Sequence, residues 1–159
     1  MVHTNYWGNM MKKLIYYIDK GFKNYEAFYE YSIPNISQDE IYARQLCTYL
    51  IKEGKQFELS YTEMNGSEEY LILKEIGYNK TKYDEKQFSK EIGIPIEFRK
   101  LGSFEEHTHL SSKVLDTHWE VIRYLLKDYV EVPEKGLFET TSTELDEDRG
   151  CYVIYVKEV

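Results

Sequence analysis

Three histidines are the residues of this 159-residue chain whose types and spacing most suggest metal binding. His107 and His109 lie two residues apart in the run Glu105-Glu106-His107-Thr108-His109, and His118 follows shortly after. On an extended segment the side chains of His107 and His109 point to the same side, so His118 or Asp116 could complete a zinc-like site. The spacing matches no established ligand pattern, and solvated or core histidines are common. We therefore expect no metal, and we rank a metal-dependent enzyme using these histidines as the third hypothesis.

The acidic run Asp146-Glu147-Asp148 is a second candidate for chemistry. Calcium is bound by several oxygen ligands, but this run lacks the spacing and the turn glycine of an EF-hand. We interpret the segment Leu145–Gly150 as the solvated tip of a hairpin.

Motifs for covalent or phosphate chemistry are missing from the sequence. Gly102-Ser103-Phe104 is not a nucleophile elbow, and Gly93 and Gly102 are too far apart to form a phosphate-binding loop. Catalysis therefore has no positive support, we predict no cofactor, and we expect a protein that is not an enzyme.

Aromatic and acidic residues dominate the composition. The chain has 16 Tyr, 7 Phe and 2 Trp, and a formal net charge of −8. Tyrosine combines a large apolar body with a polar tip and therefore suits pockets and interfaces, while a negative chain is a poor ligand for a phosphate backbone. We expect neither nucleic acid nor membrane as a partner. The predicted ligand or partner surface consists of Tyr29, Glu30, Tyr31, Tyr61, Tyr70, Tyr152 and Tyr155.

Two functions compete for this surface. The first is a binding or regulatory module that engages a protein partner, or a second copy of itself, through an acidic, tyrosine-rich surface. The alternative is a small-molecule domain with an aromatic groove between its two halves. Because a carboxylate among aromatic rings attracts cations, the ligand would be cationic or aromatic.

The sequence predicts two long helices that position these residues. Ser37 and Glu40 form a capping box, apolar residues then recur at helical spacing, and Gly54 supplies the stop. A second apolar stripe predicts a helix over residues 112–130, which ends before Pro133.

Strand patterns flank each predicted helix. Alternation predicts strands near residues 27–33, 57–61, 70–73, 94–98, 138–143 and 151–157, with helical or irregular lead-ins over 12–25 and 84–92. Asn65-Gly66 signals a hairpin turn that places Tyr61 opposite Tyr70. We expect an α+β fold, an antiparallel sheet of about six strands with two long helices on one face, built from two β-α-β-β units. This layout is similar to GyrI-like ligand-binding domains, in which two such units form a concave groove.

The last predicted strand indicates where a site would lie. Its residues Cys151–Val156 are apolar on both sides, which is typical of a strand buried on both faces. Two helices on one face leave the other face uncovered. The segment 12–25, a second protomer or a ligand must then shield it, and we expect the functional site there.

The chain reads as one domain over residues 12–159, with halves of roughly 12–77 and 78–159. Met10-Met11-Lys12-Lys13 resembles a start site, so residues 1–11 are predicted to be a flexible extension. Cys47 and Cys151 fall in apolar patterns and are expected to be buried. A secretory segment and a membrane span are both missing from the sequence, which predicts a cytoplasmic protein.

Overall fold

The structure is a computed structural model that describes residues 12–88, 93–101 and 107–159. Within these ranges, ten strands form one mixed sheet, accompanied by two helices of eight residues each. The predicted α+β fold with six antiparallel strands and two long helices is therefore wrong. The predicted flexible extension, residues 1–11, lies outside the described residues.

The first half of the chain contains five strands and helix α2. Its elements are β1 (Lys13–Asp19), β2 (Tyr25–Ser32), α2 (Gln38–Gln45), β3 (Tyr49–Lys52), β4 (Lys55–Asn65) and β5 (Glu68–Tyr78).

The second half repeats the same order of elements. It comprises β6 (Ile94–Leu101), β7 (His107–Leu115), α3 (His118–Leu125), β8 (Tyr129–Val132), β9 (Gly136–Asp146) and β10 (Cys151–Glu158). Spatially, the first half has the strand order β2-β1-β5-β4-β3 and the second β7-β6-β10-β9-β8. Each half is thus a β-β-α-β-β-β unit rather than the predicted β-α-β-β unit, and the ground for the GyrI-like resemblance is lost.

The predicted helical lead-ins account for much of this difference. The run Leu14-Ile15-Tyr16-Tyr17-Ile18 lies in strand β1, which pairs antiparallel with β2 and parallel with β5. A strand between two neighbours can be apolar on both faces, and such a run carries no clear period. In the second predicted lead-in, residues 84–88 form no helix, and residues 89–92 lie outside the described part.

Both helices are much shorter than their apolar stripes predict. Ser37 does cap α2, as expected, by accepting from the Glu40 N–H, but α2 ends at the cap residue Leu46. The stripe continues because strand β3 buries Leu50 in the same core. In the second half, Leu115 belongs to β7, Thr117 caps α3, and β8 begins at Tyr129.

The hairpin between β4 and β5 forms with a different register from the predicted one. Asn65 pairs with Glu68, so the turn is Gly66-Ser67, and a bulge lies between Leu59 and Tyr61. As a result Tyr61 lies opposite Ile72, and Tyr70 opposite Glu63.

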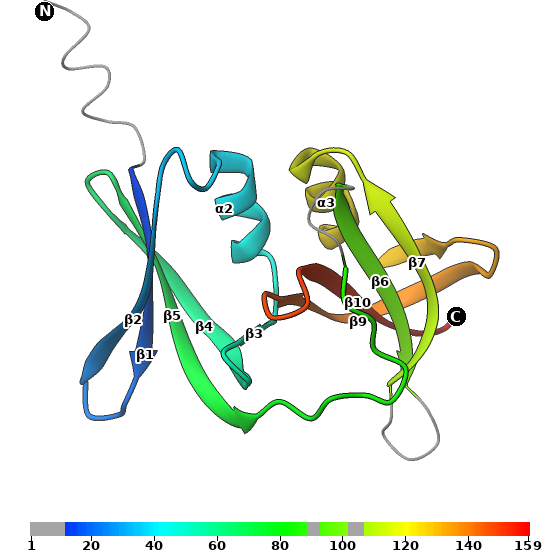
Figure 1. The fold of residues 1–159 in the computed structure, drawn as a ribbon, viewed down its shortest axis with the longest axis horizontal. Coiled ribbons are helices and arrows are strands. Elements are labelled where there is room, and N and C mark those ends of the chain that lie inside the picture. Colours follow the sequence, from blue (N-terminus) through cyan, green and yellow to red (C-terminus); the bar gives the residue numbers. More distant parts are fainter. Residues whose placement is uncertain (1–11, 89–92, 102–106) are drawn as a thin grey trace, which may run out of the picture.

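The two halves join through strands β3 and β9. Residues Tyr49–Ile51 pair in parallel with Glu144–Asp146, whereas the beginning of β9 pairs with β8. Figure 1 shows the halves side by side, with α2 and α3 on the same side of the junction. The linker that follows β5, described over residues 79–88, crosses on the other side. The two helices contact each other across the junction. No helix in the described ranges has the length and apolarity that a membrane crossing requires.

Strand β10 is buried on both faces, as predicted. Tyr152, Ile154 and Val156 join the main core beneath the helices. Cys151, Val153 and Tyr155 face the other way and pack with Phe88. The linker between the halves therefore helps to cover the second face, rather than the segment 12–25, which is strand β1 and its turn.

Candidate functional site

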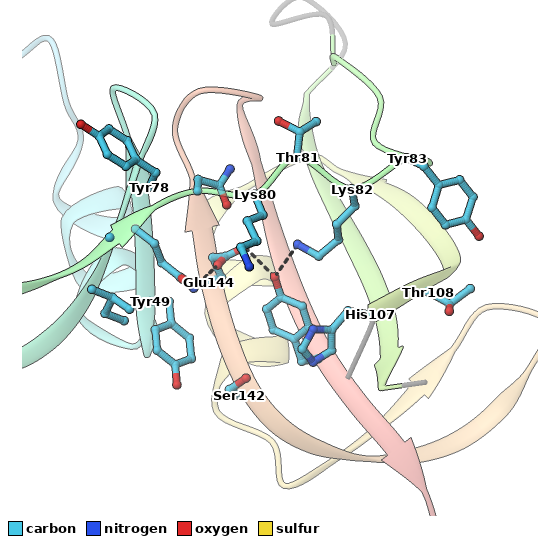
Figure 2. A pocket seen from close by; sticks show the side chains of 15 residues that line it. Tyr49, Tyr78, Lys80, Thr81, Lys82, Tyr83, His107, Thr108, Ser142 and Glu144 are labelled. Atoms are coloured by element: carbon cyan, nitrogen blue, oxygen red, sulfur yellow. Dashed lines mark hydrogen bonds between the residues drawn. The ribbon is translucent and has the colours of Figure 1, made fainter. Parts of the chain in front are cut away.

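A hollow between the two halves lies on the face of β10 that is turned away from the helices. This junction pocket has a volume of about 1040 Å³. Figure 2 shows its labelled side chains coming from three places: the first half, the linker and the second half. The residues used below are Tyr49 and Gln56 of the first half, Lys80 and Lys82 of the linker, and His107, Glu144 and Tyr155 of the second half.

A buried carboxylate and a buried tyrosine form the floor of the junction pocket. The Tyr155 hydroxyl donates to Glu144 Oε2 at 2.8 Å, and Gln56 Nε2 lies 3.5 Å from Glu144 Oε1. The Lys82 ammonium lies 3.5 Å from the Tyr155 hydroxyl. The His107 ring packs on the Tyr155 ring with centroids 4.3 Å apart. The Glu144–Tyr155 hydrogen bond therefore lies beside the paired rings of His107 and Tyr155.

Burial shifts the protonation of these groups. The Glu144 side chain is desolvated, which raises the pKa of its carboxyl group, although the Tyr155 hydrogen bond acts in the opposite direction. Burial lowers the pKa of His107, and the nearby Lys82 charge adds to this effect. Desolvation and the Glu144 charge raise the pKa of the Tyr155 phenol. At neutral pH, His107 is accordingly a neutral ring and Tyr155 a hydrogen-bond donor.

The pocket floor rests on a group of charged side chains, here called the charge network: the buried Glu97, Arg99, Asp146 and Arg149, and the partly buried Asp84. Arg99 is fully buried, and its Nη1 donates to Asp84 at 2.7 Å and to the His107 carbonyl at 2.8 Å. The same Asp84 accepts from the His109 backbone N–H. Arg99 and Asp84 thereby fix the backbone at the start of β7, from which the His107 side chain extends.

Arg149 ties the β9–β10 turn to strand β6. Its two terminal nitrogens each donate to Glu97 at 3.0 Å, and its Nε donates to Asp146 at 2.9 Å. Glu97 also accepts from Arg99. These charge-assisted bonds lower the pKa of Glu97, against the effect of burial. A bidentate pair of this kind holds the turn in one orientation.

The acidic run that the sequence placed at a solvated hairpin tip belongs partly to this buried region. Strand β9 extends to Asp146, whose side chain is buried, and the turn is the shorter segment 147–150. Asp146 accepts from the Arg149 N–H, and Gly150 adopts the left-handed φ of 75° that closes the turn. Only Asp148 is exposed, so the interpretation as a solvated tip is wrong for the rest of the run.

A second hollow, of about 530 Å³, lies on the helix side of the junction. Arg44 of α2 reaches across it and donates to Glu147 at 2.8 Å, while Tyr31 also donates to Glu147. Lys52 lies 3.8 Å from the centre of the Tyr29 ring. Arg44 is buried, and the bonds from Arg44 and Tyr31 of the first half to Glu147 of the second half hold the two halves together on this side.

The seven residues predicted as one surface are distributed over several places. Tyr29, Tyr31 and Tyr152 line the helix-side hollow, and Tyr155 lies in the junction pocket. Glu30 is exposed on β2 and pairs with Lys13. Tyr61 and Tyr70 lie on β4 and β5, where Tyr70 packs on Tyr17. The structure thus brings four of the seven to the junction, on two opposite faces.

The three candidate histidines also separate. His107 lines the junction pocket, His118 lines the helix-side hollow, and the His109 ring lies 2.7 Å from the Ser112 hydroxyl. Among the residues that the structure describes, no group of three or more His, Cys, Asp or Glu side chains is placed to hold a metal ion.

Sequence reasoning missed several residues of the site. Glu144 lies in β9 and Arg149 in the turn that follows it, so both are charged residues close to a strand that is apolar on both faces, and this position is the signal that could have singled them out. Lys82 and Gln56 gave no signal of this kind, because their roles depend on where the linker and β4 pass. Comparison with family models, with curated proteins and with solved structures finds no match for this chain.

Proposed function

We propose that the protein is a small-molecule binding module whose ligand occupies the junction pocket. The observation that carries the proposal is a concave, tyrosine-lined space that contains a buried carboxylate, between two units with the same topology. Ligand sites are typically hollows of this size with aromatic walls and a few placed polar groups.

The lining side chains favour an aromatic ligand that carries a hydrogen-bond donor. His107, Tyr155 and Tyr49 supply ring faces, and Glu144 supplies the buried acceptor. Two cationic side chains also line the pocket, but Lys82 lies 3.8 Å from Glu85 and Lys80 is exposed. The buried carboxylate of Glu144 is therefore the hydrogen-bond acceptor against which a ligand amine or ring N–H would bind.

A protein partner for the acidic, tyrosine-rich residues has less support. Tyr152 and Tyr155 are 3% and 5% exposed, and they lie on opposite faces of β10. They cannot belong to one flat contact surface.

A probe series tests the ligand class directly. Indole, tryptamine and indole-3-acetate share a ring system but are neutral, cationic and anionic. We expect tryptamine to bind most tightly and indole-3-acetate most weakly, measured by titration calorimetry and by NMR shifts of residues that line the pocket. Equal or absent binding of all three probes would remove the support for an aromatic, donor-bearing ligand.

Two variants of one strand locate the binding site. Tyr155→Phe removes the hydroxyl that bonds Glu144, whereas Tyr152→Phe makes the same change on the opposite face of β10. We expect tryptamine affinity to fall by roughly fivefold to tenfold in Tyr155→Phe, which corresponds to the net contribution of about one hydrogen bond. In Tyr152→Phe the affinity should stay unchanged. Loss of affinity in both variants, or only in Tyr152→Phe, would place the ligand elsewhere.

A further inference from the structure

The junction between the halves uses a strand edge that the chain presents a second time, unoccupied within the described residues. At the junction, Thr48 N donates to the Thr143 carbonyl at 2.9 Å, and Thr143 Oγ1 donates to the Leu46 carbonyl at 3.1 Å. Beyond these contacts, β3 and β9 pair in parallel. We call the segment from the end of α2 into β3 the donor edge, after the Thr48 N–H, and the end of β9 the acceptor edge, after the Thr143 carbonyl; the Thr143 side chain donates in the opposite direction.

The second half carries the equivalent of the donor edge. Leu126 caps α3 as Leu46 caps α2, and Tyr129 begins β8 as Tyr49 begins β3. The Asp128 carbonyl accepts from Thr140 N, as the Thr48 carbonyl accepts from Leu59 N. Among described residues β8 pairs only with β9, which leaves its other edge open. Leu126 is 59% exposed and Tyr129 53% exposed.

The first half carries the equivalent of the acceptor edge. Thr62 occupies the place of Thr143, three residues before the end of its strand, and Met64 that of Leu145. In the described chain the segment 62–65 pairs with β5 alone, whereas β9 pairs there with both β10 and β3. Leu145 is 5% exposed, but Met64 is 74% exposed. The segment Thr62-Glu63-Met64-Asn65 also contains neither the lysine nor the proline that commonly protects an open edge.

We infer that the chain associates with copies of itself head to tail, the β8 edge of one copy pairing with the β4 end of the next. Three residue types at the contact are kept: leucine at the helix cap, tyrosine at the strand start and threonine on the β4 strand. Asp128 stands in the place of Thr48, and Met64 in that of Leu145. The β4–β5 hairpin and the orange β8–β9 end of the second half lie toward opposite ends of the long axis (Figure 1). One chain therefore cannot join its own two edges, and each copy offers one of each to its neighbours. Such a heterologous contact forms rings or open chains rather than two-fold dimers.

The contact between copies is expected to be weaker than the junction within the chain. The β9–β10 turn contributes Asp148, whose carboxylate accepts from Glu53 N and Gly54 N, both at 2.8 Å, and Glu147, which pairs with Arg44. The β4–β5 turn is only Gly66-Ser67 and has no residues in these places. Association should therefore be reversible and depend on concentration.

Sedimentation analysis over a range of concentrations tests the inference. The full chain should form larger species as its concentration rises, and Leu126→Glu or Thr62→Pro should each weaken association by at least about tenfold. By analogy with Thr143, the Thr62 N–H faces away from β5, so this proline removes no bond within the chain. Phe22→Ser is the matched control, because it changes a fully exposed aromatic ring in the β1–β2 turn and should leave association unchanged.

Mixing the two variants gives the decisive result. A Leu126→Glu copy retains the β4 edge, and a Thr62→Pro copy retains the β8 edge, so an equimolar mixture should form heterodimers that neither variant forms alone. Circular dichroism and urea unfolding of each variant establish that it is folded. A chain that stays monomeric at every concentration, association that both variants leave intact, or folded variants whose mixture stays monomeric would each overturn the inference.

Discussion

Glu97 and Glu144 show how two buried carboxylates in one sheet can have opposite pKa shifts. Both are 1% exposed. Glu97 receives bonds from two arginines, which lower its pKa, whereas Glu144 receives a neutral hydroxyl and an amide, so burial dominates and raises its pKa. Glu97 consequently belongs to the stabilising framework, and Glu144 is the carboxylate left for a ligand.

Replacing Glu97 should strongly destabilise the fold. Glu97→Gln leaves Arg99 and Arg149 buried without their shared counter-charge, and breaking a buried pair costs about 3–5 kcal/mol. Urea unfolding at neutral pH measures the change. Glu158→Gln is the control, since it breaks an ion pair with Lys100 that lies at the surface, and it should change the free energy of unfolding little. Similar losses in both variants would contradict a dominant role for the charge network.

Glu144 should make the free energy of unfolding fall as pH rises. Its folded pKa is raised above the ordinary value of 4.5, so between these two values the folded state holds a proton that the unfolded state has lost. Below pH 4.5 both the folded and the unfolded state hold the proton, so Glu144 adds no pH dependence to the free energy of unfolding. Above this pH the free energy of unfolding decreases until the pH passes the folded pKa of Glu144. Glu144→Gln should therefore match the wild type near pH 4 and exceed it at pH 7, by urea unfolding at each pH. The exposed Glu58→Gln should leave the pH profile unchanged, and a Glu144→Gln profile parallel to wild type would contradict the assignment.

At the scale of elements, the sequence predicted single strands and caps better than it predicted helix length. The Ser37 cap was correct because a capping box is a local signal, confined to four consecutive residues. The apolar pattern places Leu50 and Leu115 in helices, because a short helix and an adjoining strand can bury residues in one core at spacings close to the helical period. The order of strands in the sheet depends on contacts between residues far apart in the chain, and no local pattern reports them.

The candidate site was predictable only in part, for the same reason. The two-faced burial of Cys151–Val156 was confirmed, and the junction pocket lies on the face of this strand that is turned away from the helices. That this face carries the functional site stays a prediction. What lies over that face could not be read, because the linker after β5 has no periodic pattern that would fix its path. Gln56 and Glu144 are 88 positions apart and approach only through the β3–β9 pairing.

The turn between β9 and β10 should be important for joining the halves. Asp148→Ala removes the acceptor of two N–H groups in the β3–β4 turn, Glu53 and Gly54. We expect a loss of roughly 1–2 kcal/mol, because the bonds involve a charged acceptor but are exposed. Urea unfolding gives the value, and the exposed Asp116→Ala provides the control. Asp148→Asn should lose only about half as much stability as Asp148→Ala, since one of the two acceptor oxygens remains. If Asp148→Ala lost no stability, other contacts would hold the turn.

At the scale of the whole molecule, the two units share one interior. The main core contains residues of both halves, from Leu14 and Leu71 to Phe98 and Ile154, and it includes the facing sides of α2 and α3. Polar contacts cross the junction on both sides of the sheet, through Arg44 with Glu147 and through Gln56 with Glu144. A fold assembled from two equal units can unfold as two units, but a continuous core favours one cooperative transition.

The two free cysteines report on this cooperativity, one in each half. Cys47 and Cys151 are 4% and 1% exposed, and burial raises the pKa of both thiols, so neither reacts with a thiol reagent until its surroundings open. In the single-cysteine variants Cys151→Ala and Cys47→Ala, the rate of labelling gives the free energy of opening around the remaining thiol. One cooperative unit predicts the same opening free energy and the same urea dependence at both positions, equal to the values for global unfolding. If the free energy of opening around Cys47 were clearly lower than that around Cys151, or the reverse, the halves would be separate cooperative units. Ligand binding at the junction would then have to stabilise the less stable half.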